Sequence, residues 1–188
     1  MKFMKREELS DKITIITESQ FEAQVLDKLL AESKIKFEIL SASGFSSALS
    51  TVRSLLQKRD NKILLVLDAD TNDPSKINDK KLFVETYINS KVYEDVLRTV
   101  WAIPEFEIIF FENRNILEDS LKQEIPIQFW NLAKASPKSS LLNISNKSPE
   151  YFLKLLDKKE VKEELRKSTI IKEILEFASK KENRKKRA

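Results

Sequence analysis

Apolar runs and helical apolar spacing alternate along the first half of the chain. Residues 12–17 and 63–67 have the apolar character of buried strands, and residues 36–40 alternate apolar and polar side chains as a strand does. Between them, apolar residues recur at helical spacing, which predicts helices over about residues 19–33 and after Gly44. Strand–helix units in series favour a parallel sheet with right-handed crossovers.

The same alternation continues toward the middle of the chain. Residues 71–75 predict a loop, and a helix is expected from residue 77 to about residue 90. Residues 97–103 predict a fourth strand that ends at Pro104, a residue suited to the first turn of a following helix. The fold class indicated is α/β, with a mostly parallel four-stranded, Rossmann-like sheet flanked by helices.

Helical spacing dominates the second part of the chain, where Ser and Asn clusters separate the apolar stretches. Helices are predicted at residues 127–134, 137–142, 149–157 and 161–181. We expect these helices to form an extension that packs on the α/β domain. The predicted organisation is a segment of residues 1–11, an α/β domain of residues 12–125, a helical extension of residues 126–181 and a basic tail of residues 182–188, with a turn at residues 59–62.

Composition narrows the chemistry available to the chain. Its 188 residues are 41% hydrophobic and 34% charged, and none is cysteine or histidine. Disulfides, thiolate catalysis, zinc–cysteine sites and every Ser-His or Cys-His mechanism are therefore excluded. We expect a cytoplasmic protein, because the sequence shows no membrane-length apolar stretch and no apolar signal-peptide region near its start. Proton transfer must rely on carboxylates, lysine or metal-bound water.

The net charge of +4 comes mainly from the last residues of the sequence. Six lysines and arginines between Lys180 and Arg187 face one acid, Glu182. Such a tail is typical of a solvated helix end, and it also adds sequence-independent attraction to phosphates. The body of the chain has nearly balanced charges and does not indicate a nucleic-acid surface.

Two aspartates, Asp68 and Asp70, follow the buried strand at residues 63–67. In open α/β sheets, ligands bind at the carboxyl ends of the strands, and we expect both carboxylates to lie there on one side. Hard oxygen donors of this kind favour Mg²⁺. The alternative is a polar turn with two solvated acids.

Two glutamates follow the first predicted strand. Glu18 stands at its end, and Glu22 lies four residues later on the same helix face. If the first and third strands are neighbours, Glu18 lies beside Asp68, and the cluster of acids needs a cation to neutralise it. The alternative is that Glu18 and Glu22 complement a helix N-terminus. Gly44 is the single glycine of the sequence, and we expect positive φ or close backbone approach there, at the edge of the site.

These residues resemble the Toprim family, the catalytic domain of topoisomerases, bacterial primases and overcoming-lysogenization-defect nucleases. In that family a strand ends in glutamate, a glycine turn follows, and a later strand ends in Asp-x-Asp; Glu18, Gly44, Asp68 and Asp70 match this order within residues 12–112. Ser19 departs from the glycine that usually follows the glutamate. The second glutamate, Glu22, is similar to the pattern of the standalone nuclease branch.

The resemblance implies a function and further site residues. By similarity, Glu107 is a metal ligand with Glu105 as the fallback, and Lys138 is the lysine that stabilises charge on the phosphate. The implied activity is Mg²⁺- or Mn²⁺-dependent hydrolysis of phosphodiester bonds in nucleic acid, DNA rather than RNA. The carboxylates would hold one or two metal ions, about 4 Å apart if two, and Glu18 would act as general acid or base. A phage-defence effector, with a partner ATPase or as a homo-oligomer, fits the same resemblance.

The alternative function is a Toprim-like module without catalysis, which binds nucleic acid or a partner protein through the basic tail and the helical extension. Two other classes are disfavoured. Haloacid-dehalogenase phosphatases carry Asp-x-Asp after the first strand, whereas here it follows the third. Receiver domains require an acidic pair after the first strand and a lysine after a fifth strand, and the sequence offers Glu18 alone and no clear fifth strand.

Overall fold

A computed structural model of the protein describes residues 12–58, 62–144 and 148–180. The segment of residues 1–11, most of the predicted turn at residues 59–62, and the basic tail lie outside the described residues. Across the described ranges, no helix has the length and apolar character required to cross a membrane.

The core is a four-stranded sheet in the order β2-β1-β3-β4, with every neighbouring pair parallel. Its strands are β1 (Lys12–Thr17), β2 (Lys36–Ser41), β3 (Lys62–Asp68) and β4 (Leu97–Ala102). The prediction of an α/β fold with a parallel four-stranded sheet is confirmed. The central strands β1 and β3 are adjacent, which is the arrangement that places Glu18 beside Asp68.

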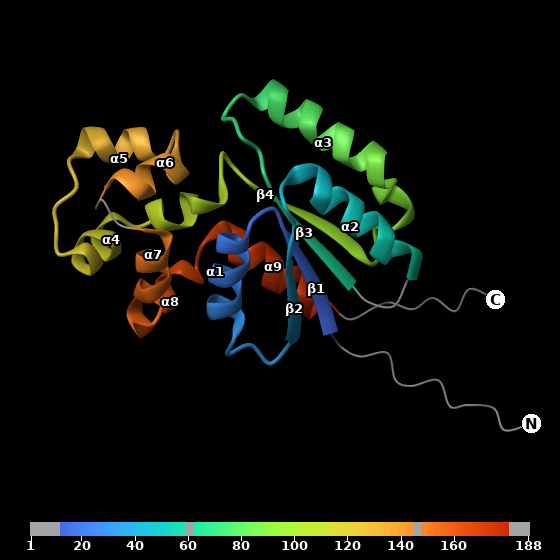
Figure 1. Ribbon diagram of the computed structural model, residues 1–188, viewed down its shortest axis with the longest axis horizontal. Helices are drawn as coiled ribbons and strands as arrows, with labels where there is room; N and C mark the ends of the chain where they lie inside the picture. The colour runs from blue at the N-terminus through green and yellow to red at the C-terminus, as the bar shows by residue number, and fades with distance from the viewer. Residues whose placement is uncertain (1–11, 59–61, 145–147, 181–188) are drawn as a thin grey trace, which may run out of the picture.

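Helices cover both faces of the sheet (Figure 1). Helices α1 (Gln20–Leu30) and α9 (Thr169–Ser179) pack on one face, in a core that contains Leu64 and Val66 of β3. Helices α2 (Phe45–Lys58) and α3 (Pro74–Ile88) belong to the core on the other face, which contains Leu65 and Leu67. Because successive β3 side chains point to opposite faces, and both faces are covered, residues 63–67 of this strand are all apolar.

Helices α4 to α8 gather beyond the carboxyl end of the sheet and beside α1 (Figure 1). Two short 3₁₀ helices, η1 (Ser90–Val92) and η2 (Phe106–Phe111), flank β4 along the chain. The further helices are α4 (Arg114–Leu121), α5 (Ile127–Ala133), α6 (Pro137–Asn143), α7 (Pro149–Leu155) and α8 (Lys159–Leu165). Contacts of α9 with β4 and of α6 with η2 join this part of the chain to the sheet.

Several predicted elements differ from the observed ones, and α4 was not predicted. Helix α3 begins at Pro74 rather than residue 77, because Asp73 caps it by accepting a hydrogen bond from the Ser75 N–H. Pro104 forms a cis peptide bond and stands before the helix rather than in its first turn. The expected long helix over residues 161–181 is divided into α8 and α9, and Ser168 caps the second of them.

Candidate active site

The end of β1 is organised by a reciprocal cap on α1. The Ser19 hydroxyl accepts a hydrogen bond from the Glu22 N–H and donates one to Glu22 Oε1 at 2.7 Å. Glu22 Oε2 in turn accepts from the Glu18 N–H at 3.0 Å. This is a capping box, so Glu22 does complement the helix N-terminus, as the alternative interpretation held. The serine that departs from the Toprim pattern is the residue that positions Glu22.

Asp68 joins β1, β3 and η2 at the carboxyl edge of the sheet. Its N–H donates to Glu18 Oε1 at 2.9 Å, and its buried Oδ1 accepts from the Phe106 N–H at 2.8 Å. Glu18 and Asp68 therefore lie side by side, although they are 50 residues apart in sequence. The carboxylate of Asp68 is held by the first residue of η2.

The side chain of Asp70 is 65% exposed, whereas Asp68 is buried. Its φ of 58° is left-handed, a conformation that aspartate tolerates better than most residues, and its N–H donates to the Pro104 carbonyl. This turn ends the strand alternation and leaves the Asp70 carboxylate exposed at the sheet edge, close enough to Glu18 to raise the pKa of that residue. There, Lys80 Nζ donates to Asp70 Oδ2 at 2.5 Å and to the Asp68 carbonyl at 2.8 Å.

Lys80 is a residue of the site that sequence reasoning missed. It extends from α3, and its ammonium also lies 4.7 Å from the centre of the Phe45 ring. The available signal was Asp73-Pro74, the cap and first position of a helix. A helix that starts there places Lys80 in its second turn, close to the end of β3.

Glu107 and Lys138 also lie at the carboxyl edge of the sheet. We name the acids gathered there the acidic edge: Glu18, Glu22, Asp68 and Glu107, with Asp70 at its rim. Glu107 is buried on η2, and its Oε2 has no hydrogen-bond partner among the described residues. Glu105, the fallback ligand, instead accepts a hydrogen bond from the Lys138 N–H at 2.9 Å. This bond brings the start of α6 to the edge of the sheet, where the Lys138 ammonium interacts favourably with Glu107, Asp68 and Glu22.

Burial and mutual repulsion raise the pKa values of the acids in this cluster. Burial is the largest cause for Asp68, and repulsion by Glu22, Glu107 and Glu18 adds to it, so that its pKa rises to about 8. Burial likewise raises the pKa of Glu107 to about 7. The pKa values of Glu18 and Glu22 are also raised, mainly by burial. Burial lowers the pKa of Lys138, but the surrounding carboxylates outweigh it and raise that pKa.

Gly44 lies beside Glu18 and adopts φ of +94°, which confirms the expectation of a positive φ. Its N–H donates to the Glu18 carbonyl at 2.9 Å. The glycine therefore allows the turn after β2 to close against the end of β1.

The carboxylates present a donor set suited to a hard divalent cation. Two observations fit a cation at this edge: Glu107 Oε2 is buried with no hydrogen-bond partner within residues 12–58, 62–144 and 148–180, and the pKa values of the neighbouring acids are raised. However, in the described part of the chain no group of three or more acidic side chains is arranged so that it could hold a metal ion. The acids are gathered at one edge, but their observed side-chain positions do not form a coordination sphere.

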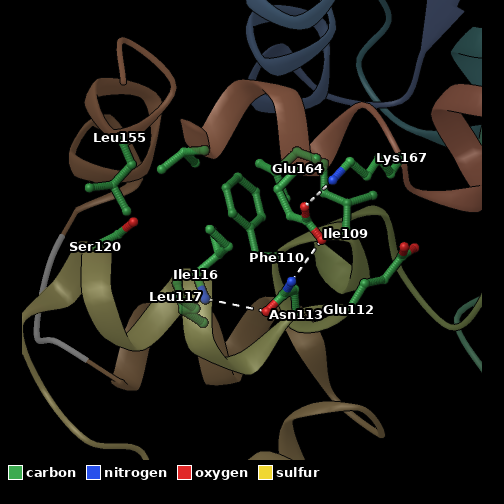
Figure 2. Close-up of a pocket in the computed structure, with 12 residues that line it drawn as sticks. Ile109, Phe110, Glu112, Asn113, Ile116, Leu117, Ser120, Leu155, Glu164 and Lys167 are labelled. Atoms are coloured by element: carbon green, nitrogen blue, oxygen red, sulfur yellow. Dashed lines mark hydrogen bonds and ion pairs between the residues drawn. The ribbon is translucent and has the colours of Figure 1, made fainter. Parts of the chain in front are cut away.

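A pocket lies away from this edge, between η2, α4, α7 and α8 (Figure 2). Apolar side chains such as Phe110 and Leu117 line it, and Glu164 links Asn113 and Lys167 by hydrogen bonds at one side. None of the predicted site residues lines it. Its composition offers no cluster of catalytic groups.

Comparisons of the chain with protein-family models, curated proteins and solved structures found no match.

Proposed function

We propose that this protein is a metal-dependent nuclease of the Toprim type that hydrolyses phosphodiester bonds in nucleic acid, DNA rather than RNA. The observation that carries the proposal is that Glu18 after β1, Asp68 of β3 and Glu107 of η2 converge on one sheet edge. The buried Oε2 of Glu107 has no hydrogen-bond partner in the part of the chain that the structure describes. Structural acids in folded proteins are normally paired, so an acidic cluster of this kind favours a ligand that is positively charged.

The residues that would hold Mg²⁺ or Mn²⁺ are Glu18, Glu22, Asp68 and Glu107, with Asp70 at the rim. The ion would supply Lewis acidity toward the phosphate and the leaving oxygen. Asp70 is the weakest member of the set, because Lys80 already neutralises its carboxylate.

The side chains of the chain account for proton transfer and charge stabilisation. Glu18 is half-buried, and burial raises its pKa, which strengthens it as the acceptor of the proton of the attacking water. The water oxygen bonds to phosphorus as the bond from phosphorus to the leaving nucleotide oxygen breaks. Lys138 stabilises the negative charge that grows on the phosphate oxygens. A role in phage defence, with a partner ATPase or a second copy, rests on the resemblance alone.

Cleavage of single-stranded and plasmid DNA with Mn²⁺ or Mg²⁺ tests this proposal. We expect cleavage by the wild type, a loss of about a hundredfold or more for Glu18→Gln, and a comparable loss for Asp68→Asn. Glu160→Gln, an exposed acid on α8, is the matched control and should cleave like the wild type. Absence of cleavage, or cleavage that Asp68→Asn leaves unchanged, would contradict the proposal.

The second candidate is a Toprim-like module that binds nucleic acid or a protein partner without catalysis. It is favoured by the absence, within the described residues, of an acidic group arranged to hold a metal ion. It predicts binding without cleavage under the same conditions.

A further inference from the structure

Helix α3 exposes large apolar residues outside its buried face. Ile77, Val84 and Ile88 are buried against the core, whereas Leu82, Phe83 and Tyr87 are 64%, 52% and 39% exposed. Figure 1 shows α3 on the outer side of the molecule, next to α2. Large apolar side chains gathered on a surface cost solvation free energy and mark binding sites more often than isolated ones do.

Two of these exposed residues and the half-buried Phe45 of α2 form a continuous row of rings, which we name the aromatic stripe: Phe45, Phe83 and Tyr87. The centre of the Phe83 ring lies 6.2 Å from that of Phe45 and 5.9 Å from that of Tyr87, and the planes are inclined by 29° and 24°. Phe83 and Tyr87 are four residues apart and therefore share one face of α3. Phe45 is the first residue of α2.

A cation stands at each end of the aromatic stripe. The Arg53 guanidinium lies 4.9 Å from the centre of the Tyr87 ring, and Lys80 Nζ lies 4.7 Å from that of Phe45. Lys80 is the same residue that binds Asp70 and the Asp68 carbonyl. The stripe thus begins at the acidic edge of the sheet and runs outward along α3 to Arg53.

We propose that the aromatic stripe is a stacking platform that delivers single-stranded nucleic acid to the acidic edge. This inference rests on the proposed function for the identity of the site that it serves. Near-parallel aromatic rings beside the exposed Arg53 guanidinium match the chemistry of a single strand, whose bases stack on rings while its phosphates meet a cation. Lys80 is paired with Asp70 and therefore holds the Phe45 end of the stripe rather than a phosphate. In a duplex the base faces are stacked on one another, so a duplex gains little from such a surface.

Binding measured in EDTA tests the stripe independently of cleavage. The probe is a fluorescein-labelled oligothymidylate of about 16 nucleotides, followed by anisotropy. We expect Phe83→Ala and Tyr87→Ala each to weaken binding by about fivefold or more. Phe83→Leu should weaken it similarly, because it keeps the apolar surface but loses the ring. Leu82→Ala, on the same helix outside the stripe, is the control and should bind like the wild type.

Three results would overturn the inference. The first is wild-type affinity in Phe83→Ala and Tyr87→Ala, and the second is retained affinity in Phe83→Leu. The third is a dimer by light scattering that Phe83→Ala converts to a monomer while the oligonucleotide affinity stays unchanged, which would assign the stripe to a second copy of the chain. Weaker binding of a labelled duplex than of the single strand supports the inference, and tighter binding of the duplex contradicts it.

A small diester separates this inference from the proposed function. Hydrolysis of bis(p-nitrophenyl) phosphate by the wild type with Mn²⁺ reports on the acidic edge without the need for stacked bases. If the wild type hydrolyses the diester but the stripe substitutions leave oligonucleotide binding unchanged, the stripe inference fails and the function stands. If the diester is not hydrolysed but the stripe substitutions weaken oligonucleotide binding, the proposed nuclease function is contradicted and the aromatic stripe is supported as a binding surface.

Discussion

At the scale of single residues, Asp68 has a pKa that is raised to about 8, above the value of about 7 for Glu107 in the same acidic edge. Its carboxyl is buried, repelled by three glutamates and satisfied by one N–H donor from Phe106. A carboxyl whose pKa is raised in the folded state makes folding less favourable as pH rises. Asparagine keeps the acceptor for the Phe106 N–H and removes the charge.

Asp68→Asn should therefore stabilise the protein in a pH-dependent way when metal is removed by EDTA. The pKa of Asp68 rises from 3.8 to about 8 on folding, so the wild type loses stability relative to the variant between these pH values. Below pH 3.8 both states carry the proton, and the difference should vanish. Urea unfolding of both proteins between about pH 4 and pH 9 measures this difference in unfolding free energy.

Asp27→Asn on α1 provides the control for this experiment, because Asp27 is exposed and lies outside the acidic edge. Its unfolding free energy should follow that of the wild type over the same pH range. A difference between Asp68→Asn and the wild type that is constant with pH would contradict the raised pKa of Asp68.

At the scale of elements, the break between α8 and α9 shows why one expected helix became two. Arg166 donates to the Leu29 carbonyl and pairs with Glu32, which ties the end of α8 to the end of α1. Ser168 is buried and its hydroxyl accepts from the Ile171 N–H at 3.3 Å, which starts α9 in a new direction. Helix α9 then packs against β4 and closes one face of the sheet.

Ser168→Ala should lower the free energy of unfolding by about 1 kcal/mol, because it leaves a donor at the start of α9 without its cap. Ser136→Ala is the matched control: Ser136 precedes α6, but its side chain makes no capping hydrogen bond. Chemical denaturation of both variants measures the difference. Equal effects of the two substitutions would show that the cap does not stabilise α9.

At the scale of the whole molecule, the acidic edge links folding to cation binding. Its acids come from β1, α1, β3 and η2, so a cation that binds them contacts the folded chain at several points. A ligand that binds the folded state alone stabilises it by mass action, by about 2.7 kcal/mol at a concentration a hundredfold above Kd.

Mn²⁺ should therefore raise the Tm of the wild type by roughly 5–10 °C when it is present at about a hundredfold excess over Kd. Asp68→Asn should show a much smaller rise, and Glu160→Gln should respond like the wild type. Differential scanning fluorimetry with and without Mn²⁺ measures the shift. If Asp68→Asn responds as strongly as the wild type, the ion binds elsewhere.

Much of the fold and the centre of the candidate site could be predicted from sequence. The four strands, whose apolar patterns are local, were placed within one residue or so of their observed ends. Parallel order then places Glu18 beside Asp68, because the carboxyl ends of neighbouring parallel strands meet at one edge. The positive φ of Gly44 also follows from the scarcity of glycine in the chain.

Only the tertiary structure determines which groups the acids contact. The left-handed turn at Asp70 sends its carboxylate to Lys80, and the bond from the Lys138 N–H to Glu105 brings α6 to the sheet edge across 33 residues. It also decided that Phe45 and Phe83, which lie on different helices, stack in one row. Periodicity reports which face of an element is buried, but contacts between distant elements depend on packing geometry that no local pattern records.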